Sequence, residues 1–453
     1  VLNKPTLVTS WTQFTSIFGD FTPGAYLPDA VYGYFANGGG SCYVVSLRTL
    51  SEEEDEPDHA AATVPAKGRG NSFRVVAKTP GPSDLSVTVK AGEEETFSVT
   101  VGGETKAGLT MKKGEANYVG DAAFGAVDIA DVGSATAVPA EGTFALEGGG
   151  VPALTVDDFV GSVADRSGFA GLEAIDEVRI LVAPDAMTGY DGSEAAKERV
   201  KMIQSAMVAH CESLKYRFAI LDAPPGLNAQ QAQEWRQYLN LDTSYAALYY
   251  PWIRVADLSG GGSTSKLMPP SGHMAGIYNR TDAERGVHKA PANEVVRGAI
   301  RFERNISHPE QELLNPRGVN CLRFFPGRGY RLWGARTASS DPEWKYIGPR
   351  RYFLFLEHSI DRSTQWAVFE NNGPLLWANI REAVVSFLYN EWRSGNLLGA
   401  TPEEAFFVRC DRSTMTQNDL DNGRLICLIG VAVLKPAEFV IFRIGQKTAD
   451  SRD

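Results

Sequence analysis

The chain has 453 residues, of which 43% are apolar, 22% charged and 10% aromatic, and its formal net charge is −11. A chain of this length and composition can bury a large core in two to four domains, which excludes global disorder. The acidic balance disfavours a nucleic-acid-binding protein, because such proteins need a basic surface to contact phosphates.

The sequence holds five cysteines, an odd number with no CxxC pair: Cys42, Cys211, Cys321, Cys410 and Cys427. Most of them lie in apolar runs, as in VNCLRFF and RLICLIG, so we expect buried free thiols and folding in a reducing cytoplasm. The sequence contains no run of 18 apolar residues, so we expect no direct membrane insertion.

The first expected elements are two short helices and a strand. Residues 10–18 place four apolar side chains on one face, with Ser10 as a plausible N-cap. Residues 29–37 repeat this spacing and end in Gly38-Gly39-Gly40, which leads into a strand over residues 42–47.

The composition changes after residue 50. SEEEDEPD at residues 51–58 is an acidic tract and is expected to be a solvated linker. Short alternations such as FRVVAK, LSVTVKA, TFSVTVG and GTFALEGG then follow between Gly, Pro and Asp clusters over residues 73–146. This pattern predicts a small antiparallel β domain inserted into a host fold, at its periphery.

Strands alternate with helices after residue 168. Continuous apolar runs predict buried strands over residues 177–183, 217–221 and 245–255. Between them, residues 194–214 and 228–239 have helical spacing. This order predicts a central α/β layer with mainly parallel pairing.

The last part of the chain begins with a helix expected over residues 349–365. An amphipathic helix follows over residues 374–393, with Trp377, Ile380 and Val384 on its apolar stripe. Strands over residues 406–409, 425–434 and 439–444 end the chain.

We therefore predict an α/β and α+β multidomain protein with four parts. These are residues 1–49 as the N-terminal part of the core, 50–160 as the inserted peripheral β domain, 161–345 as the central α/β domain, and 346–453 as an α+β C-terminal domain with a terminal strand arm.

An α/β layer invites an enzyme interpretation, since ligands bind at the carboxyl ends of such strands. Asp185 and Asp222 are expected there, and His273 in a Ser271-Gly272-His273 turn, so an α/β hydrolase is one alternative. The sequence has no GxSxG elbow, and an Asp close to Pro at a strand end is usually a turn or cap residue. We therefore expect no catalytic residue.

Three other patterns predict no cofactor, metal or nucleic acid. GGGSTSK at residues 260–266 lacks the Gly before Lys that a phosphate loop needs, so a flexible surface loop is expected. The six histidines form no HxxxH or HExxH spacing. The arginines of residues 323–336 alternate with aromatic residues, which suits single-stranded nucleic acid, but the net acidity favours subunit contacts.

The most informative segment is residues 269–344, which is dense in Arg, Gly, Pro and aromatic residues but holds no recognised catalytic or metal spacing. Such a segment suggests shape and contact as its function. Its blocks PPSGHMAGIYNRTDAERGVHKAPAN, LNPRGVNCLRFFPGRGYRLWGART and SSDPEWKY closely resemble, in family order, the central motif of contractile tail sheath proteins. Further blocks of this resemblance lie at residues 26–45, 399–408 and 435–440.

Sheath proteins of this family normally begin with an extended arm that reaches a neighbouring subunit. Residues 1–5 of this chain stand where that arm should already have ended, so we expect the arm to be missing from the sequence.

The resemblance implies a structural subunit, not an enzyme, that polymerises in helically stacked six-membered rings around an inner tube. The lattice contracts to drive the tube through a target envelope, without cofactors. Implied partners are copies of this chain, the inner tube protein, and baseplate and terminator or cap proteins. The particle would assemble in the bacterial cytoplasm as part of a virion or of a releasable phage-tail-like particle, and the C-terminal blocks favour an injection system. A non-contractile baseplate or capsid subunit is the remaining alternative.

The resemblance also implies three sets of contact residues. The inter-subunit strand consists of Phe439, Val440, Ile441, Phe442, Arg443 and Ile444. The inner-tube contact consists of Arg381, Asn390 and Arg393. The inter-subunit contacts of the central motif are Arg280, Arg285, Arg328, Arg331 and Arg336.

Overall fold

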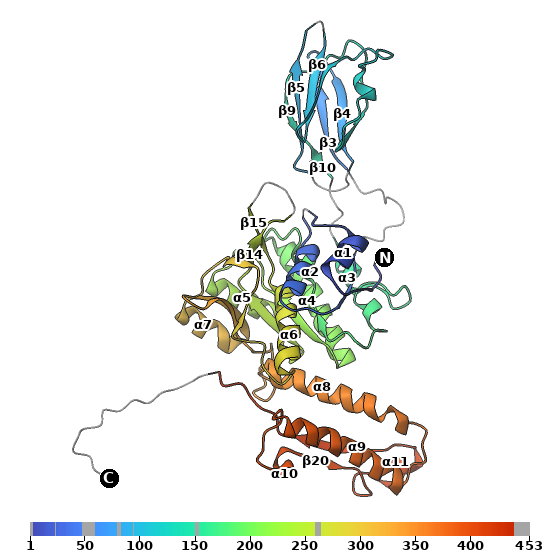
Figure 1. Ribbon diagram of the computed structural model, residues 1–453, viewed down its shortest axis with the longest axis vertical. Coiled ribbons are helices and arrows are strands. Elements are labelled where there is room, and N and C mark those ends of the chain that lie inside the picture. Colours follow the sequence, from blue (N-terminus) through green and yellow to red (C-terminus); the bar gives the residue numbers. More distant parts are fainter. Residues whose placement is uncertain are drawn as a thin grey trace, which may run out of the picture.

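The computed structural model describes residues 3–22, 24–47, 59–78, 83–93, 95–149, 154–258 and 264–438. The chain forms an elongated molecule with three bodies along its longest axis (Figure 1). A β sandwich lies at one end, an α/β body in the middle, and a helical body at the other end. The residue boundaries of the four predicted parts stay a prediction.

A six-stranded sheet forms the centre of the middle body, in the order β11-β12-β13-β18-β19-β16. The strands from β11 to β18 are parallel, with Ile220 opposite Ala247 and Tyr249 opposite Asn320, which confirms the predicted parallel pairing. The strands β19 and β16 add an antiparallel edge. The bounds are β11 Ile180–Leu181, β12 Phe218–Asp222, β13 Ala246–Tyr250, β16 Glu294–Val295, β18 Val319–Phe325 and β19 Gly329–Trp333.

Helices cover both faces of this sheet. The helices α4 (Glu194–Leu214) and α5 (Ala229–Leu239) pack on one face, against a core that includes Leu221 of β12. The helix α6 (Ser271–Arg285) packs on the other face, where Ile220 of β12 belongs to a second core. Successive side chains of a strand point to opposite faces, so one five-residue strand supplies both cores.

The predicted helices of this body are present, but two predicted strands differ. The run over residues 177–183 forms only the two-residue strand β11. The run over 245–255 divides at Pro251, which has no N–H to donate to the ladder. Its second half, β14 (Ile253–Ala256), joins β15 (Ser265–Met268) and β17 (Ala299–Phe302) in a separate antiparallel sheet.

The predicted Ser271-Gly272-His273 turn is wrong, because these residues begin α6. The prolines before it suit a helix start, where backbone N–H groups lack helical partners anyway. The predicted loop over 260–266 lies partly outside the described residues, and Ser265 and Lys266 belong to β15.

The N-terminal part packs beside the central sheet as β1 (Thr6–Val8), α1 (Trp11–Phe18), α2 (Leu27–Ala36) and β2 (Cys42–Val44). The side chain of Ser10 accepts a hydrogen bond from the Gln13 N–H at 3.2 Å, which confirms the predicted N-cap. The strands β1 and β2 pair antiparallel.

The predicted antiparallel strands between residues 60 and 148 are present and form two four-stranded sheets. Both sheets enclose a core of their own, which includes Phe73, Val87 and Phe97. The strands are β3 Ala60–Pro65, β4 Asn71–Ala77, β5 Ser86–Ala91, β6 Phe97–Val101, β7 Glu104–Leu109, β8 Val127–Ala130, β9 Gly142–Ala145 and β10 Glu147–Gly148.

The helical body contains α8 (Ile347–Thr364), α9 (Pro374–Arg393), and a short hairpin of β20 (Phe406–Arg409) and β21 (Leu428–Val431). The predicted stripe of α9 is buried in one core with Tyr352 of α8. The predicted strand over 425–434 is shorter than expected, and the predicted strand over 439–444 lies outside the described residues. The remaining α-helices of the whole chain are α3 Val156–Val160, α7 His308–Leu314, α10 Pro402–Ala405 and α11 Gln417–Asp421. Its 3-10 helices are η1 Val119–Asp121, η2 Ala170–Leu172, η3 Pro184–Met187, η4 Asn315–Arg317 and η5 Gln365–Ala367.

Candidate assembly surfaces

The glycines of the first motif block allow α6 to lie directly against α2. A Cβ on Gly272 would be 2.5 Å from the carbonyl oxygen of Ala30, and a Cβ on Gly276 would be 2.4 Å from that of Tyr34. Both distances are below van der Waals contact, so only glycine permits this approach. The SGHMAG block therefore positions α6 against α2.

Arg280 is buried and its guanidinium group is used within the chain. It donates to the carbonyl oxygens of Asn37 at 3.0 Å and Val295 at 2.9 Å, and Glu294 lies 3.7 Å away. Within the chain, Arg280 thus connects α6 to the loop after α2, and its contact with a neighbouring subunit stays a prediction. By contrast, Arg285 at the end of the same helix is exposed.

A second buried arginine joins the helical body to the central body. Arg351 of α8 donates to both carboxylate oxygens of Asp282 in α6, at 2.9 and 2.5 Å. Its guanidinium carbon lies 4.7 Å from the ring centroid of Tyr278. This two-point contact orients α8 relative to α6 (Figure 1).

Three residues of the central motif converge on one carboxylate of the C-terminal segment. Arg336 donates to both carboxylate oxygens of Glu438, at 2.8 and 2.7 Å. Asn315 donates to the same group at 2.7 Å, and the Tyr346 hydroxyl donates at 3.0 Å. We name these four residues the Glu438 clamp.

The electrostatics of the clamp favour an ionised Glu438. Partial burial raises the pKa of Glu438. The hydrogen bonds from Arg336 and Asn315 lower this pKa by more than burial raises it, so the net shift is downward. Arg336 is itself buried and its partner Glu438 is in its own chain, while its contact with a neighbouring subunit stays a prediction.

Two further arginines predicted as inter-subunit contacts lie on the β18–β19 hairpin. Arg328 is exposed and stacks over Phe325 and Trp333, at 5.3 Å from each ring. Arg331 donates to the carbonyl oxygen of Asn293 at 2.7 Å and keeps part of its surface exposed. Inter-subunit contact by Arg285, Arg328 and Arg331 stays a prediction.

The predicted tube-contact residues Arg381, Asn390 and Arg393 are all exposed on α9. The structure adds an exposed apolar stripe on the same helix, formed by Leu375, Val385 and Tyr389. Sequence reasoning missed this stripe, although its spacing of ten and four residues is visible in the chain.

The residues of the alternative hydrolase are structural. The carboxyl group of Asp222 accepts the Ser271 N–H at 2.9 Å, and burial raises its pKa to about 7. The carboxyl group of Asp185 accepts the N–H groups of Tyr26 and Leu27, and burial raises its pKa. His273 is buried against Gly33, and burial lowers its pKa to about 4.

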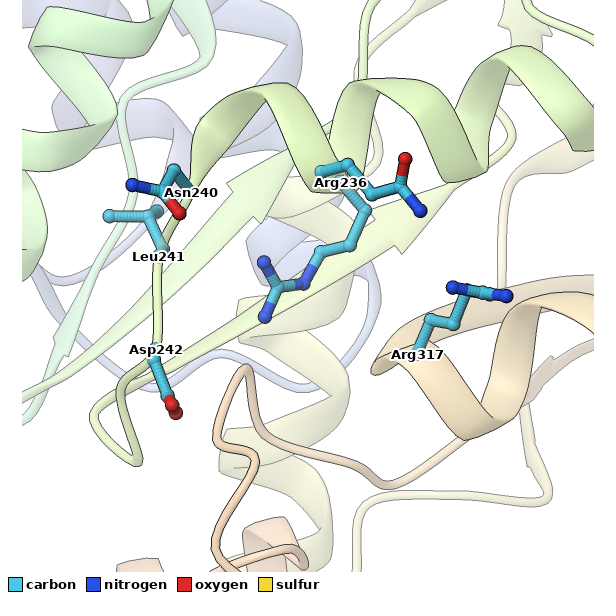
Figure 2. Close-up of a pocket in the computed structure, with 6 residues that line it drawn as sticks. Arg236, Asn240, Leu241, Asp242 and Arg317 are labelled. Carbon is cyan, nitrogen blue, oxygen red and sulfur yellow. The ribbon is translucent and has the colours of Figure 1, made fainter.

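Two cavities lie on the central body. A surface pocket of about 360 Å³ lies at the end of α5, with Arg236 on one side and Arg317 of η4 on the other (Figure 2). Arg236 donates to the carbonyl oxygen of Ala338 at 2.6 Å, so one of the two arginines is already used. A groove of about 1190 Å³ runs between the N-terminal helices and β11 and is largely apolar.

Neither a metal nor a membrane is indicated by the described residues. Over residues 3–438, with the gaps given above, there is no group of three or more His, Cys, Asp or Glu side chains placed to hold a metal ion. Within the same ranges, no helix combines the length and apolarity that crossing a bilayer requires.

The cysteines are reduced. Cys211, Cys321 and Cys410 are buried as predicted, whereas Cys42 and Cys427 are only partly buried, so the prediction is wrong for these two residues. Cys427 lies directly before β21, whose residues are exposed or only partly buried.

Comparison with known families matches most of the chain after the β sandwich. Residues 170–338 match the model of the phage tail sheath protein central domain, and residues 339–447 match that of the phage tail sheath C-terminal domain. The chain belongs to the contractile tail sheath family.

Individual sheath proteins show the same relationship. The chain is 24% identical over 313 residues to a prophage major tail sheath protein of Pseudomonas aeruginosa, covering 66% of this chain and 75% of the relative. It is 27% identical over 219 residues to the tail sheath protein of Burkholderia phage BcepMu, covering 44% and 42% of the two chains.

Two solved sheath structures share the fold over nearly the whole chain. The sheath of an extracellular contractile injection system, PVC, in the contracted state covers 99% of this chain and 88% of its own, with a TM-score of 0.63 and 25% identity. The contracted helical sheath of the anti-feeding prophage covers 98% and 89%, with a TM-score of 0.64 and 24% identity. The protein is therefore a structural sheath subunit.

The sheath motif can now be assigned to contacts. Its glycines allow the close contact between α2 and α6. Arg280 binds the carbonyl oxygen of Asn37 at the end of α2. Arg336, Asn315 and Tyr346 bind the carboxylate of Glu438. Sequence reasoning did not single out Glu438, although it lies in a block, KPAEF, that carried the resemblance.

Proposed function

We propose that this sheath subunit assembles in helically stacked six-membered rings around an inner tube, and that neighbouring subunits are linked by exchange of the strand 439–444. Its partners are further copies of this chain, the inner tube protein, and baseplate and cap proteins. Family membership and the fold shared with helical sheath structures support this proposal.

The observation that carries the proposal is a two-stranded sheet with exposed apolar side chains. Among the described residues, β20 and β21 form a sheet of only two strands. Phe407 and Leu428 on these strands are 52% and 50% exposed. A third strand that adds to such an edge gains main-chain hydrogen bonds and covers these side chains.

The Glu438 clamp fixes where the exchanged segment leaves its own subunit. It ends one residue before FVIFRI, a run of high β propensity without Gly or Pro. An apolar strand of this kind has to be covered, because an uncovered one promotes aggregation. The clamp thus holds the base of the arm while the arm pairs elsewhere.

Contraction in this proposal needs no nucleotide. If the extended lattice is a kinetic trap, new contacts in the compact lattice supply the free energy, and linked arms keep the subunits connected. We place the particle among the injection systems, which is supported by the 99% coverage of this chain in the comparison with the PVC sheath. Neighbouring capsid and terminase genes would instead indicate a phage.

Two matched truncations test the strand exchange. One ends at Lys435 and removes both the clamp carboxylate and the strand, and the other ends at Glu438 and removes the strand alone. We expect both proteins to be folded and monomeric, and to form no sheath tubes in electron micrographs. Tubes of normal length from the chain ending at Glu438 would contradict strand exchange, and aggregation of both would place the strand in its own core.

Contact between α9 and the tube is a second part of the proposal. If Arg381 and Arg393 meet acidic groups of the tube protein, reversal of both to Glu weakens co-assembly of sheath and tube at low salt. Exposed ion pairs contribute only about 0.2–1 kcal/mol each, but a helical lattice repeats them many times. The matched control reverses Arg362 and Arg412, two exposed arginines of the same body. Equal co-assembly of both double variants would contradict the assignment.

A further inference from the structure

Two cysteines face each other where the β20–β21 hairpin ends. The paired residues run from Phe406 opposite Val431 to Arg409 opposite Leu428. The next opposite positions are Cys410 and Cys427. The two thiol groups are close enough to interact directly.

The ladder gives this pair the geometry that a disulfide needs. The Ala432 N–H donates to the carbonyl oxygen of Ala405 at 2.7 Å, so this opposite pair is a hydrogen-bonded one. Pairs alternate along an antiparallel ladder, so the same register, continued one position beyond the last paired residues Arg409 and Leu428, assigns Cys410 and Cys427 to a non-hydrogen-bonded pair. Cα atoms of such pairs lie about 4.5 Å apart, within the roughly 4.4–6.8 Å that disulfides span.

We propose that Cys410 and Cys427 are a redox modification site, and that they form a reversible disulfide which closes the β20–β21 hairpin. The loop between them is already closed at this point, since the Thr414 hydroxyl donates to the carbonyl oxygen of Ile426 at 2.7 Å. The other three cysteines belong to other parts of the fold, because Cys42 packs with the N-terminal core and Cys211 and Cys321 with the central core.

The two sulfurs have different roles. Cys427 is partly exposed and meets the oxidant first, whereas Cys410 is buried and resolves the intermediate. With glutathione disulfide as oxidant, the Cys427 thiolate attacks one of its sulfurs and releases one glutathione. The Cys410 thiolate then attacks the Cys427 sulfur and releases the second glutathione. Two protein thiols are oxidised, one glutathione disulfide is reduced to two thiols, and the two protons pass to the glutathiones.

The surroundings make this exchange slow but possible. Burial raises the pKa of Cys427 to about 12, so few thiolates exist at neutral pH. The cation of Arg381 on α9 opposes this shift. In a reducing cytoplasm the pair stays reduced. In oxidising surroundings the disulfide closes the loop between β20 and β21, and this cross-link stabilises the hairpin against unfolding.

Peptide mapping of the full chain tests the bond. The unassembled protein is incubated with glutathione disulfide at pH 8.5, the remaining thiols are blocked, and trypsin is added without reductant. We expect a cross-linked pair of peptides, residues 410–412 and residues 425–443. The protein should lose two hydrogens in mass, and its melting temperature should rise and return after reduction.

Cysteine variants make the outcome specific. Cys427→Ser and Cys427→Ala should both lose the cross-link and the rise in melting temperature, whereas the control Cys42→Ser should keep both. A stable glutathione adduct on Cys427 with a free Cys410 in the unmodified chain would overturn the proposal. A cross-link that joins any other pair of cysteines, or a cross-link without a change in melting temperature, would also overturn it.

Discussion

The carboxyl group of Asp222 shows what a buried acid does in the sheath fold. It lies at the end of β12 and holds the first N–H of α6, and burial raises its pKa to about 7. Since the pKa in the unfolded chain is near 3.8, the folded state binds the proton more tightly. The resulting stabilisation is complete below about pH 4 and is lost as the pH rises through about 7.

Asp222→Asn tests this dependence, since the amide keeps an acceptor oxygen and cannot ionise. We expect the free energy of unfolding of the unmodified protein, relative to the variant, to fall between pH 5 and pH 8. The raised pKa of Asp222 corresponds to a change of at most about 4 kcal/mol in the free energy of unfolding. Urea unfolding of unassembled protein at four pH values measures it. His273, whose pKa burial lowers to about 4, is present in both proteins, so its acid destabilisation cancels in the difference. Parallel pH profiles for the two proteins would contradict a perturbed Asp222.

The arginines of the central motif and of the adjoining helix α8 divide by burial, which sequence alone did not reveal. Arg280, Arg336 and Arg351 each use their guanidinium groups on partners within the chain. Arg285 and Arg328 are exposed. All five look alike in the sequence, because the partners of the buried ones lie from 15 to 243 residues away and the fold alone brings them together.

At the scale of elements, the sequence predicts helices best where a long amphipathic pattern is present. The helices over 194–214 and 374–393 have long amphipathic stripes and end where expected. The sequence analysis predicts no helix at α6, because glycines are turn signals in most contexts, whereas here they serve close packing against α2. The β18–β19 hairpin was missed too, although FPGRG between two aromatic runs is a usable turn signal.

The α2–α6 contact makes a prediction about stability. A Cβ on Gly276 would lie 2.4 Å from the carbonyl oxygen of Tyr34 and 2.8 Å from the Cβ of Asn37. Gly276→Ala must therefore push the helices apart, which costs about 1–3 kcal/mol and outweighs the helix propensity gained. We expect a lower urea midpoint in unassembled protein. Gly40→Ala is the control, because the nearest heavy atom would be 3.8 Å away, and an equal loss from both variants would contradict the packing argument.

The candidate assembly residues were predictable only in part. The exposure of Arg381, Asn390 and Arg393 follows from the amphipathic pattern of α9, because residues outside its apolar stripe face solvent. The Glu438 clamp could not be derived in that way. It joins residues 315, 336, 346 and 438, and no local pattern brings four positions so far apart to one carboxylate.

At the scale of the whole molecule, the attachment of the β sandwich predicts that it can be removed. Its first and last strands are neighbours, with Ala60 opposite Gly148, so the chain enters and leaves at almost one point. Its core contains no residue of the central cores. The sandwich also projects from one end of the molecule (Figure 1). These features suit a decoration that assembly does not require.

Replacing residues 60–148 with a short Gly/Ser linker should therefore leave tube assembly intact. Paired strands lie about 5 Å apart, so a few residues span the gap. A longer deletion of residues 50–160 is the informative comparison, because it also removes Phe159 of α3, which is buried in the central core with Phe169 and Met207. We expect tubes of normal length from the shorter deletion in electron micrographs. From the longer one we expect a destabilised subunit, since losing a buried Phe costs about 3–5 kcal/mol. A folded short-deletion protein that forms no polymer would show that the sandwich takes part in the lattice.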